Sequence, residues 1–255
     1  MEEVKLALIP PVSWLETASS TGYQLVLPML MAENPEYARF YRGLRLNRLQ
    51  YMILDNGAAE EEQVPDQELA AIALKEKVNE VAMPDVLADM YATVERSKRF
   101  ARQYGVPLAA KGIKLGYVAQ GRSITECIEG ILASQKFSVR PMTIYLPRLL
   151  LAATGIPNIR IDLAQWIAAS YPELDIHFFG MDAYYMSELK RANHVLGDYL
   201  RGVDTSAPFN FAFHDYPIDG DREARRPDDY FDLPKEAFKQ PTLDYNIRKL
   251  QAWTR

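Results

Sequence analysis

Short apolar runs alternate with longer mixed stretches along most of this chain. The runs are typical of buried strands, and the stretches between them have the length of helices. The predicted strands are, in chain order, Val4–Ile9, Tyr23–Met31, Tyr51–Leu54, Glu80–Asp85, Leu115–Gln120, Met142–Leu146, Ile176–Phe179 and a last strand that ends at Asp204. Pro28 interrupts the second of these strands, which predicts an edge or a rim at that point.

The stretches between the strands predict helices. Residues 33–49 mix aromatic residues with arginines without a clean period and predict helix and loop. The clearer helices are Pro65–Lys77, Asp89–Tyr104, Ser123–Gln135, Ile161–Ser170 and Ala183–Leu196. Gly105 and Pro107 predict the end of the second of these, because both residues disfavour a continued helix.

Alternation of strands and helices implies parallel strands joined by right-handed crossovers. About seven or eight such strands favour an α/β fold with a closed (β/α)8 TIM-type barrel over an open doubly wound sheet, and a barrel needs about 250 residues. The 255 residues therefore predict a single domain, 1–255. Residues 215–234 are charged and carry prolines, which predicts a surface excursion. A last helix within residues 235–255 should pack Leu243, Ile247, Leu250 and Trp253 against the barrel.

Composition narrows the functional classes. Nearly half of the residues are apolar, which suits a sizeable core, and no run approaches the roughly 20 apolar residues of a membrane span. The start of the chain lacks the pattern of a secretion signal, so a cytoplasmic location is expected. One cysteine, Cys127, excludes an internal disulfide, and with three histidines a metal site is not expected; each histidine is expected to be a packed or surface residue. Without a Gly-x-Gly-x-x-Gly or Walker sequence, no cofactor is predicted.

The net charge of −5 does not indicate a nucleic-acid-binding domain by itself. Arginines and lysines nevertheless cluster at residues 42–48, 96–102 and 222–226. Each cluster could hold phosphates or form a solvated helix face.

Candidate chemistry appears where the predicted strands end. Asp55, Asp85, Gln120-Gly121, Gly180 and Asp204 each close an apolar run. Ligand chemistry in parallel α/β proteins occurs at that end of the strands. Asp55 could instead cap the following helix, with its neighbours Asn56 and Gly57 forming a turn.

Two carboxylates across a barrel mouth suit the cleavage of a bond at a sugar anomeric carbon, where one attacks and the other moves protons. Asp55 and Asp204 are the candidates for this pair. Asp85 and Gln120, with the main chain at Gly121 and Gly180, could contact the edge of a planar heterocycle. The residues alone predict a barrel hydrolase or transferase.

Five segments in sequence resemble the ordered motifs of the tRNA-guanine transglycosylase superfamily. They are Leu54-Asp55-Asn56-Gly57-Ala58, Met83-Pro84-Asp85, Val118-Ala119-Gln120-Gly121, His177-Phe178-Phe179-Gly180 and Val203-Asp204-Thr205-Ser206-Ala207. The resemblance implies a barrel enzyme with Asp204 as nucleophile and Asp55 as general acid/base. It also implies that Asp85, Gln120, Gly121, Gly180 and Asn56 bind a guanine or 7-deazaguanine base.

The implied reaction is a two-step exchange. Asp204 attacks C1′ of a guanosine nucleotide and guanine leaves; a 7-deazaguanine base then displaces the carboxylate, and Asp55 handles the proton. The tRNA enzymes carry a Cys-x-Cys-x-x-Cys plus His zinc subdomain, which one cysteine cannot supply, and Tyr145-Leu146-Pro147-Arg148 stands where they often have Gly-Gly-Leu. The chain therefore looks more like the zinc-free DNA-guanine transglycosylases of phages and bacteria.

The expected partners are accordingly DNA, with tRNA less favoured, and a free 7-deazaguanine base such as 7-cyano-7-deazaguanine. A phage-encoded protein would act in the host cytoplasm. A homodimer or a partner protein of a modification system stays open, and no membrane association is expected. The alternatives are a tRNA-guanine transglycosylase, a glycosidase or nucleoside hydrolase that uses the same acids, and a non-catalytic nucleic-acid-binding subunit.

Overall fold

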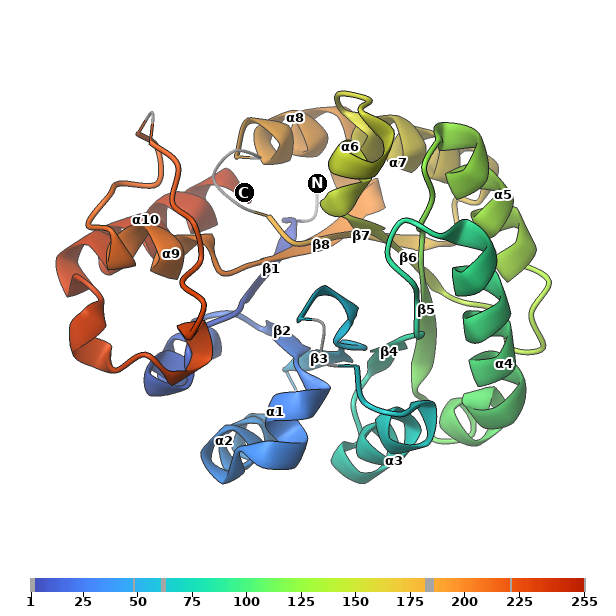
Figure 1. The fold of residues 1–255 in the computed structure, drawn as a ribbon, viewed down its shortest axis with the longest axis horizontal. Coiled ribbons are helices and arrows are strands. Elements are labelled where there is room, and N and C mark those ends of the chain that lie inside the picture. Colours follow the sequence, from blue (N-terminus) through green and yellow to red (C-terminus); the bar gives the residue numbers. More distant parts are fainter. Residues whose placement is uncertain (1–2, 48, 61–62, 182–185, 221, 255) are drawn as a thin grey trace.

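Eight parallel strands form one sheet that curves into a nearly closed barrel, with the helices around its outside (Figure 1). The computed structural model describes residues 3–47, 49–60, 63–181, 186–220 and 222–254. The strands are β1 (Lys5–Leu8), β2 (Tyr23–Val26), β3 (Tyr51–Leu54), β4 (Glu80–Ala82), β5 (Lys114–Val118), β6 (Thr143–Pro147), β7 (Asp175–Phe179) and β8 (Leu200–Thr205). The predicted (β/α)8 TIM-type barrel is confirmed.

The helices follow the strands around the barrel. They are α1 (Pro28–Glu33), α2 (Pro35–Arg45), α3 (Asp66–Glu76), α4 (Met90–Ala109), α5 (Ile124–Ser134), α6 (Leu149–Thr154), α7 (Ile159–Ser170), α8 (Met186–Leu196), α9 (Ala207–Phe213) and α10 (Gln240–Trp253). Short 3-10 helices occupy Val12–Ser20, Ala58–Glu60, Gly197–Tyr199, Tyr230–Asp232 and Lys235–Ala237. No helix in the described part of the chain is long and apolar enough to span a membrane.

The sheet order is β1-β8-β7-β6-β5-β4-β3-β2. The two strands at the ends of this order, β1 and β2, lie beside each other, but among the described residues no hydrogen-bonded ladder joins them. The barrel therefore has one seam. At every other joint the register is parallel, so the carboxyl ends of the strands meet at one rim.

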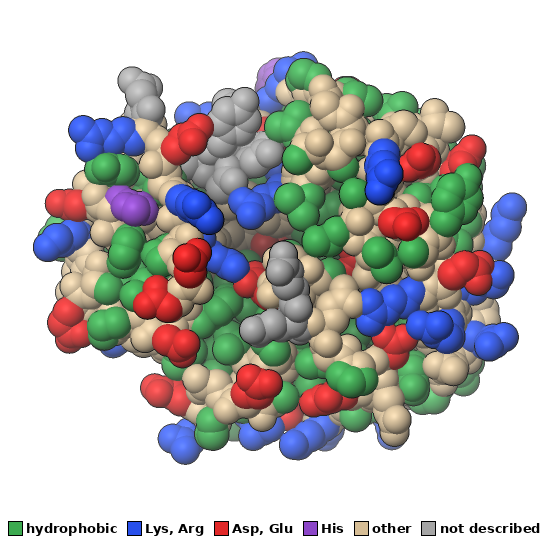
Figure 2. Space-filling view, viewed as in Figure 1, with side chains coloured by type: hydrophobic (Ala, Val, Ile, Leu, Met, Phe, Trp, Pro, Cys, Tyr) green, Lys and Arg blue, Asp and Glu red, His purple; other side chains and the backbone are tan. Residues whose placement is uncertain are grey.

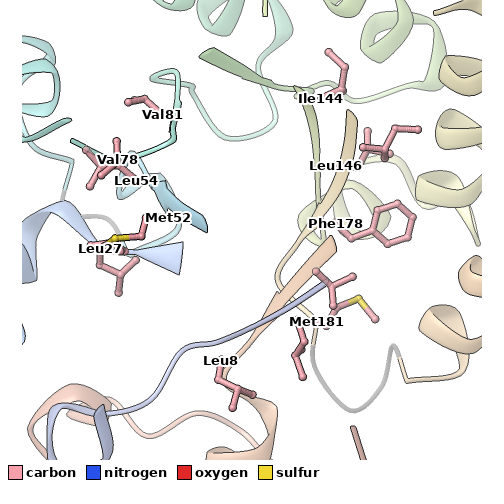
Figure 3. Packing of buried hydrophobic residues seen from close by; sticks show 14 of the residues in the cluster. Leu8, Leu27, Met52, Leu54, Val78, Val81, Ile144, Leu146, Phe178 and Met181 are labelled. Carbon is pink, nitrogen blue, oxygen red and sulfur yellow. The ribbon is translucent and has the colours of Figure 1, made fainter. Parts of the chain in front are cut away.

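Alternation along each strand divides the core into two layers. Inside the barrel, Ala7, Leu25, Ile53, Val118 and Tyr145 form a small cluster. The residues of the opposite strand face pack against the surrounding helices in a larger cluster, part of which Figure 3 shows with Leu8, Leu54, Ile144, Leu146 and Phe178. Because successive strand side chains point to opposite faces, a strand of only three to six residues contributes to both layers.

The second predicted strand is wrong beyond Val26. Strand β2 ends there, and Pro28 begins helix α1 instead of interrupting a strand. Proline suits the first turn of a helix because its missing N–H would have no partner there. In the following segment, helix α2 is capped by Asn34, whose side chain accepts hydrogen bonds from the N–H groups of Glu36 and Tyr37.

The predicted end of helix α4 at Tyr104 is also wrong, since the helix continues past Gly105 and Pro107 to Ala109. A Cβ atom at Gly105 would lie 2.8 Å from Cγ2 of Val139, so glycine permits a close approach there. Leu108 is fully buried and anchors the last turn. Burial of this turn outweighs the local preference of glycine and proline.

Helices α6 and α9 have no counterpart in the predicted elements. The predicted start of a helix at Ala183 lies outside the described residues, while α8 ends at Leu196 as expected. The segment after α9 runs over the outside of the barrel as predicted, yet it is anchored: Tyr230 is buried and its hydroxyl donates to the carbonyl of Ile9 at 2.5 Å. In the final helix, Leu243 and Leu250 are fully buried.

Candidate active site

A cavity of about 850 Å³ opens at the carboxyl ends of the strands. The predicted site residues that line it are Asp55, Asn56, Asp85, Gln120, Gly180 and Asp204. A hollow is visible near the middle of the face in Figure 2, with Arg and Lys side chains beside it. Ligand pockets usually have volumes of about 300–1,000 Å³. The fold thus brings two candidate catalytic acids and most of the candidate base-binding residues to one pocket.

Asp204 is the fifth residue of β8 and points into the barrel. Its side chain is buried. Oδ2 accepts a hydrogen bond from the backbone N–H of Gly180 at 3.0 Å, and Oδ1 lies 2.9 Å from Nε2 of His177, within hydrogen-bond distance. Burial raises the pKa of Asp204 to about 7, while the Gly180 N–H and the positive charges of Arg160 and Arg148 act in the opposite direction.

Gly180 follows β7 and has a left-handed backbone, with φ +69°. This conformation aims its N–H at Asp204, and a side chain there would be strained. Arg160, which is fully buried on α7 and paired with Glu188, donates to the carbonyl of Phe179 at 3.2 Å and to that of Gly180 at 3.1 Å. The carbonyl of Phe179 and the N–H of Gly180 belong to one peptide, so Arg160 fixes the peptide that donates to Asp204.

Asp55 directly follows β3, and its backbone N–H donates to the carbonyl of Val26 at 2.9 Å. Gly57 adopts φ +79° two residues later, which turns the chain away from the strand end. Burial raises the pKa of Asp55 to about 7, and the negative charges of Asp204, Asp85 and Glu60 raise it further against the lowering effect of the Asn56 N–H. Its neighbourhood is acidic, whereas that of Asp204 contains donors and arginines.

Asp85 is clamped by two amides. Asn56 Nδ2 donates to Oδ1 at 2.8 Å, and Gln120 Nε2 donates to Oδ2 at 2.5 Å. Both amides are oriented by the backbone, since Asn56 Oδ1 accepts from the N–H of Ala58 and Gln120 Oε1 accepts from the N–H of Ala88. Burial raises the pKa of Asp85, although the two amide donors favour the charged form. Each carboxylate oxygen keeps a further lone pair for a ligand donor.

Gly121 does not line the cavity. A Cβ atom there would lie 3.0 Å from Cβ of Glu126 and 3.1 Å from Sγ of Cys127, so this glycine packs against the start of α5. It allows the strand end and the helix to approach closely. Gly121, which was predicted to contact the base, is therefore not among the residues that line this cavity.

Several lining residues were not among the candidates from the sequence. They include Glu60, Arg148, Asn210, Arg225 and Arg226. The charged cluster 222–226 was noted in the sequence, but its distance from the strand ends along the chain gave no reason to assign it to the mouth. Arg226 forms a bidentate ion pair with Glu60, which joins the segment after α9 to the turn after β3.

Asn210 on α9 is buried, and its Oδ1 has no hydrogen-bond partner among the described residues. Its Nδ2 donates to Oγ of Ser206 at 3.2 Å. Within the described residues, no group of three or more His, Cys, Asp or Glu side chains is arranged to hold a metal ion.

No protein-family model and no curated protein sequence matches this chain.

Proposed function

We propose that this protein is a base-exchange transglycosylase. It would replace guanine in a polynucleotide, with DNA favoured, by a 7-deazaguanine base such as 7-cyano-7-deazaguanine, through a covalent aspartyl-nucleotide intermediate. One observation carries the proposal: Asp55 and Asp204 line the same cavity, whose wall also presents Asp85 held by Asn56 and Gln120. Two acids beside a clamped acceptor suit the exchange of a nucleobase on its sugar.

The environment of Asp204 suits a nucleophile. A nucleophilic carboxylate must be ionised. Burial raises the pKa of Asp204 to about 7, whereas the Gly180 N–H, the contact with His177 and the charges of two nearby arginines favour the ionised form. In the first step Asp204 Oδ attacks C1′, the C1′–N9 bond breaks, and its electron pair goes to guanine N9. Asp204 and the nucleotide are then joined by a glycosyl ester.

The environment of Asp55 suits an acid that gives and recovers one proton. Burial raises the pKa of Asp55 to about 7, and the negative charge of Asp204 also acts to raise it. The proposed exchange starts from protonated Asp55 and ionised Asp204, so that the pair holds one proton. Protonated Asp55 gives its proton to the departing guanine at N9. In the second step N9 of the incoming base attacks C1′, the ester bond to Asp204 breaks, and the N9 proton returns to Asp55. Both acids regain their starting states.

Asp85 suits recognition of the base. Guanine and 7-deazaguanine present two neighbouring donors, N1–H and the amino group, and a carboxylate offers only acceptors. The clamp by Asn56 and Gln120 fixes the direction of those acceptors before a ligand arrives. In a duplex the target nucleotide must leave the stack to reach this cavity, at a cost of a few kcal/mol.

DNA is favoured over tRNA by what the sequence lacks. The zinc subdomain of the tRNA enzymes needs several cysteines, and this chain has one. Arg148, Arg225 and Arg226 line the cavity and give it positive charge, which favours backbone phosphates of either polymer.

The test is to incubate the purified protein with duplex DNA or tRNA and with labelled guanine or 7-cyano-7-deazaguanine. We expect label to enter DNA, Asp204→Ala to abolish incorporation, and Asp55→Ala to reduce it by at least about 100-fold, the usual scale for a lost acid/base. Asp162→Ala on helix α7 is a control for a carboxyl group outside the cavity. Unchanged exchange in Asp204→Ala would remove the proposed nucleophile, and release of free base without incorporation would indicate a hydrolase.

A further inference from the structure

A chain of buried polar side chains runs through the inside of the barrel to Asp204. Arg201 Nε donates to the hydroxyl of Tyr23 at 3.0 Å, this hydroxyl lies 2.9 Å from Nδ1 of His177, and Nε2 of His177 lies 2.9 Å from Oδ1 of Asp204. Tyr23 and His177 are 2% and 0% exposed, and neither lines the cavity. They therefore act on a ligand only through Asp204.

The far end of this chain is an ion cluster at the amino ends of the strands. The guanidinium of Arg201 donates to Glu80 at 2.8 and 3.1 Å and to Asp175 at 2.9 Å. Glu80 also accepts from the hydroxyls of Tyr51 and Tyr145. Arg201 is thus fixed in position as a permanent donor.

The direction of each hydrogen bond follows from this end. Arginine can only donate, so the Tyr23 oxygen accepts from Arg201 and the Tyr23 hydrogen is directed to His177 Nδ1. Burial lowers the pKa of His177 well below its usual value, so the ring is neutral and carries one hydrogen. Because Nδ1 accepts, that hydrogen is on Nε2 and is donated to Asp204.

Protonation of Asp204 would require the hydrogen bonds between Tyr23, His177 and Asp204 to run in the opposite direction. A protonated Asp204 could donate to a bare Nε2, and the His177 hydrogen would then move to Nδ1, where it faces an oxygen that already accepts from Arg201. The Tyr23 hydrogen would lose its acceptor. The fixed donor at Arg201 thus favours the ionised form of Asp204.

Space for this chain is built into the sheet. Gly202 on β8 faces the Tyr23 ring, and a Cβ atom there would lie 2.7 Å from Cε1 of Tyr23. The rings of Tyr145 and Phe179 pack edge-on against His177. The imidazole therefore cannot turn away from Asp204 without displacing neighbours.

We propose that Tyr23 and His177 are positioning residues that transmit the fixed donor of Arg201 to Asp204 and hold Asp204 as an oriented carboxylate. The inference deepens the proposed function, because Asp204 is the proposed nucleophile. It concerns proton positions that can be measured without any substrate.

Other charged groups lie near the same chain and influence how Asp204 and His177 titrate. Those near Asp204 are Asp55 after β3, Arg160 on α7 and Arg148 after β6. Those near His177 are Tyr23, Arg201, Glu80, Arg160 and Asp204. Among the groups near Asp204, His177 and the Gly180 N–H are those that hydrogen-bond to its carboxylate.

The test uses nuclear magnetic resonance on the free protein. At pH 8, above the pKa of about 7 of Asp204, nitrogen shifts of His177 should show a single neutral tautomer with hydrogen on Nε2, and Tyr23→Phe should populate the second tautomer. In His177→Phe the pKa of Asp204, followed through the chemical shift of its carboxyl carbon, should rise by about one to two pH units. This rise corresponds to the loss of one charge-assisted hydrogen bond. His177→Gln should largely restore it, because a glutamine amide can donate from near the position of Nε2.

Tyr51→Phe is the matched control. Its hydroxyl belongs to the same ion cluster, at 2.6 Å from Glu80 and 3.4 Å from Arg201, and its ring stacks on Tyr23. In the described part of the chain, the side chains that hydrogen-bond to His177 are Tyr23 and Asp204 and do not include Tyr51. It should leave the Asp204 titration unchanged. If His177→Phe does not fold, the inference is tested by the tautomer of His177 alone, measured in the native protein and in Tyr23→Phe.

A hydrogen on Nδ1 in the native protein would overturn the inference, and so would an unchanged Asp204 titration in folded His177→Phe. In the exchange assay, the acid limb of kcat/KM should move with the titration. If the native protein incorporates no base while the tautomer and titrations are as expected, the proposed function fails and this inference stands.

Discussion

Gly180 joins backbone conformation to chemistry at a single residue. Its positive φ aims one N–H at Asp204 Oδ2, and an added Cβ would lie 3.2 Å from Cδ of Arg148. A left-handed conformation costs a residue with a side chain roughly 1–2 kcal/mol. If a residue with a side chain stood at position 180, rotation of this peptide would relieve the strain and would move the N–H donor away from Asp204.

We expect Gly180→Ala to lower the rate of covalent intermediate formation by about tenfold, which corresponds to about 1.4 kcal/mol of barrier. Single-turnover trapping of the aspartyl-nucleotide measures this. Gly197→Ala is the matched control, because Gly197 also has a positive φ of +53° but a Cβ there would meet nothing within 4 Å. Equal loss in both variants would mean that backbone strain, and not the donor, accounts for the effect.

At the scale of elements, the segment after α9 is tied to the turn after β3 by the ion pair of Arg226 with Glu60. The pair is partly exposed, so it should contribute about 1 kcal/mol or less to overall stability. Its position at the cavity mouth suggests a larger effect on ligand binding. The Arg226 guanidinium also lies 5.6 Å from the ring centroids of Tyr230 and Phe231.

We expect Arg226→Ala to raise KM for the polynucleotide several-fold with kcat within about twofold, because the tie shapes the mouth and not the reacting groups. Glu60→Gln should raise KM likewise, but it also removes a negative charge that raises the pKa of Asp55, so only its KM reports on the tie. Steady-state kinetics at fixed salt measures this. Arg42→Ala breaks a comparable bidentate pair with Glu76, between α2 and α3 and outside the cavity, and should change neither constant. A lower KM in Glu60→Gln would show that Arg226 binds phosphate better when released.

At the scale of the whole molecule, the buried carboxyls make stability depend on pH. The folded pKa values of Asp55 and Asp204 are about 7, above the usual 3.8 of an aspartate. Between pH 4 and 7 these two groups therefore bind more protons in the folded protein than in the unfolded chain, and together they make the free energy of unfolding fall as pH rises. His177 acts oppositely below about pH 6.5, because burial lowers its pKa, but it is one group against two. Glu80 acts oppositely at lower pH, because Arg201 helps to lower its pKa to about 2 against burial.

We expect the native protein to be less stable at pH 8 than at pH 5, and Asp204→Asn to remove much of that difference. Urea denaturation at both pH values measures it. Asp219→Asn is the control: Lys249 lowers the pKa of Asp219, so that group is ionised in both states over this range. A native protein with equal or greater stability at pH 8 would contradict the pKa values assigned to the two aspartates.

The sequence alone was sufficient for the barrel and for the acids at its rim, because both depend on local patterns. Asp55 and Asp204 were recognisable as polar residues that close apolar strands. The role of His177 was not, since a histidine inside an apolar run resembles a packed residue until its partners from β2 and β8 are known. Arg225 and Arg226 were likewise hidden, because only tertiary folding brings a segment so late in the chain to the mouth.

The end of helix α4 and the position of Pro28 show where local sequence preferences predict the wrong structure. Gly105, Pro107 and Pro28 have strong local preferences, and the sequence shows these preferences without the packing around them. Contact of Gly105 with Val139 and burial of Leu108 decided the actual helix end. Local propensity is a weak guide where tertiary burial opposes it.

The seam between β1 and β2 has a consequence for the ligands that the cavity admits. Ile9 follows β1, and Leu25 and Leu27 lie on or after β2; all three line the cavity beside this joint. Elsewhere the wall can widen only by breaking backbone hydrogen bonds between strands. Here the two strands can separate at the expense of side-chain contacts alone, so a bulkier group on an incoming base is accommodated most cheaply on this side.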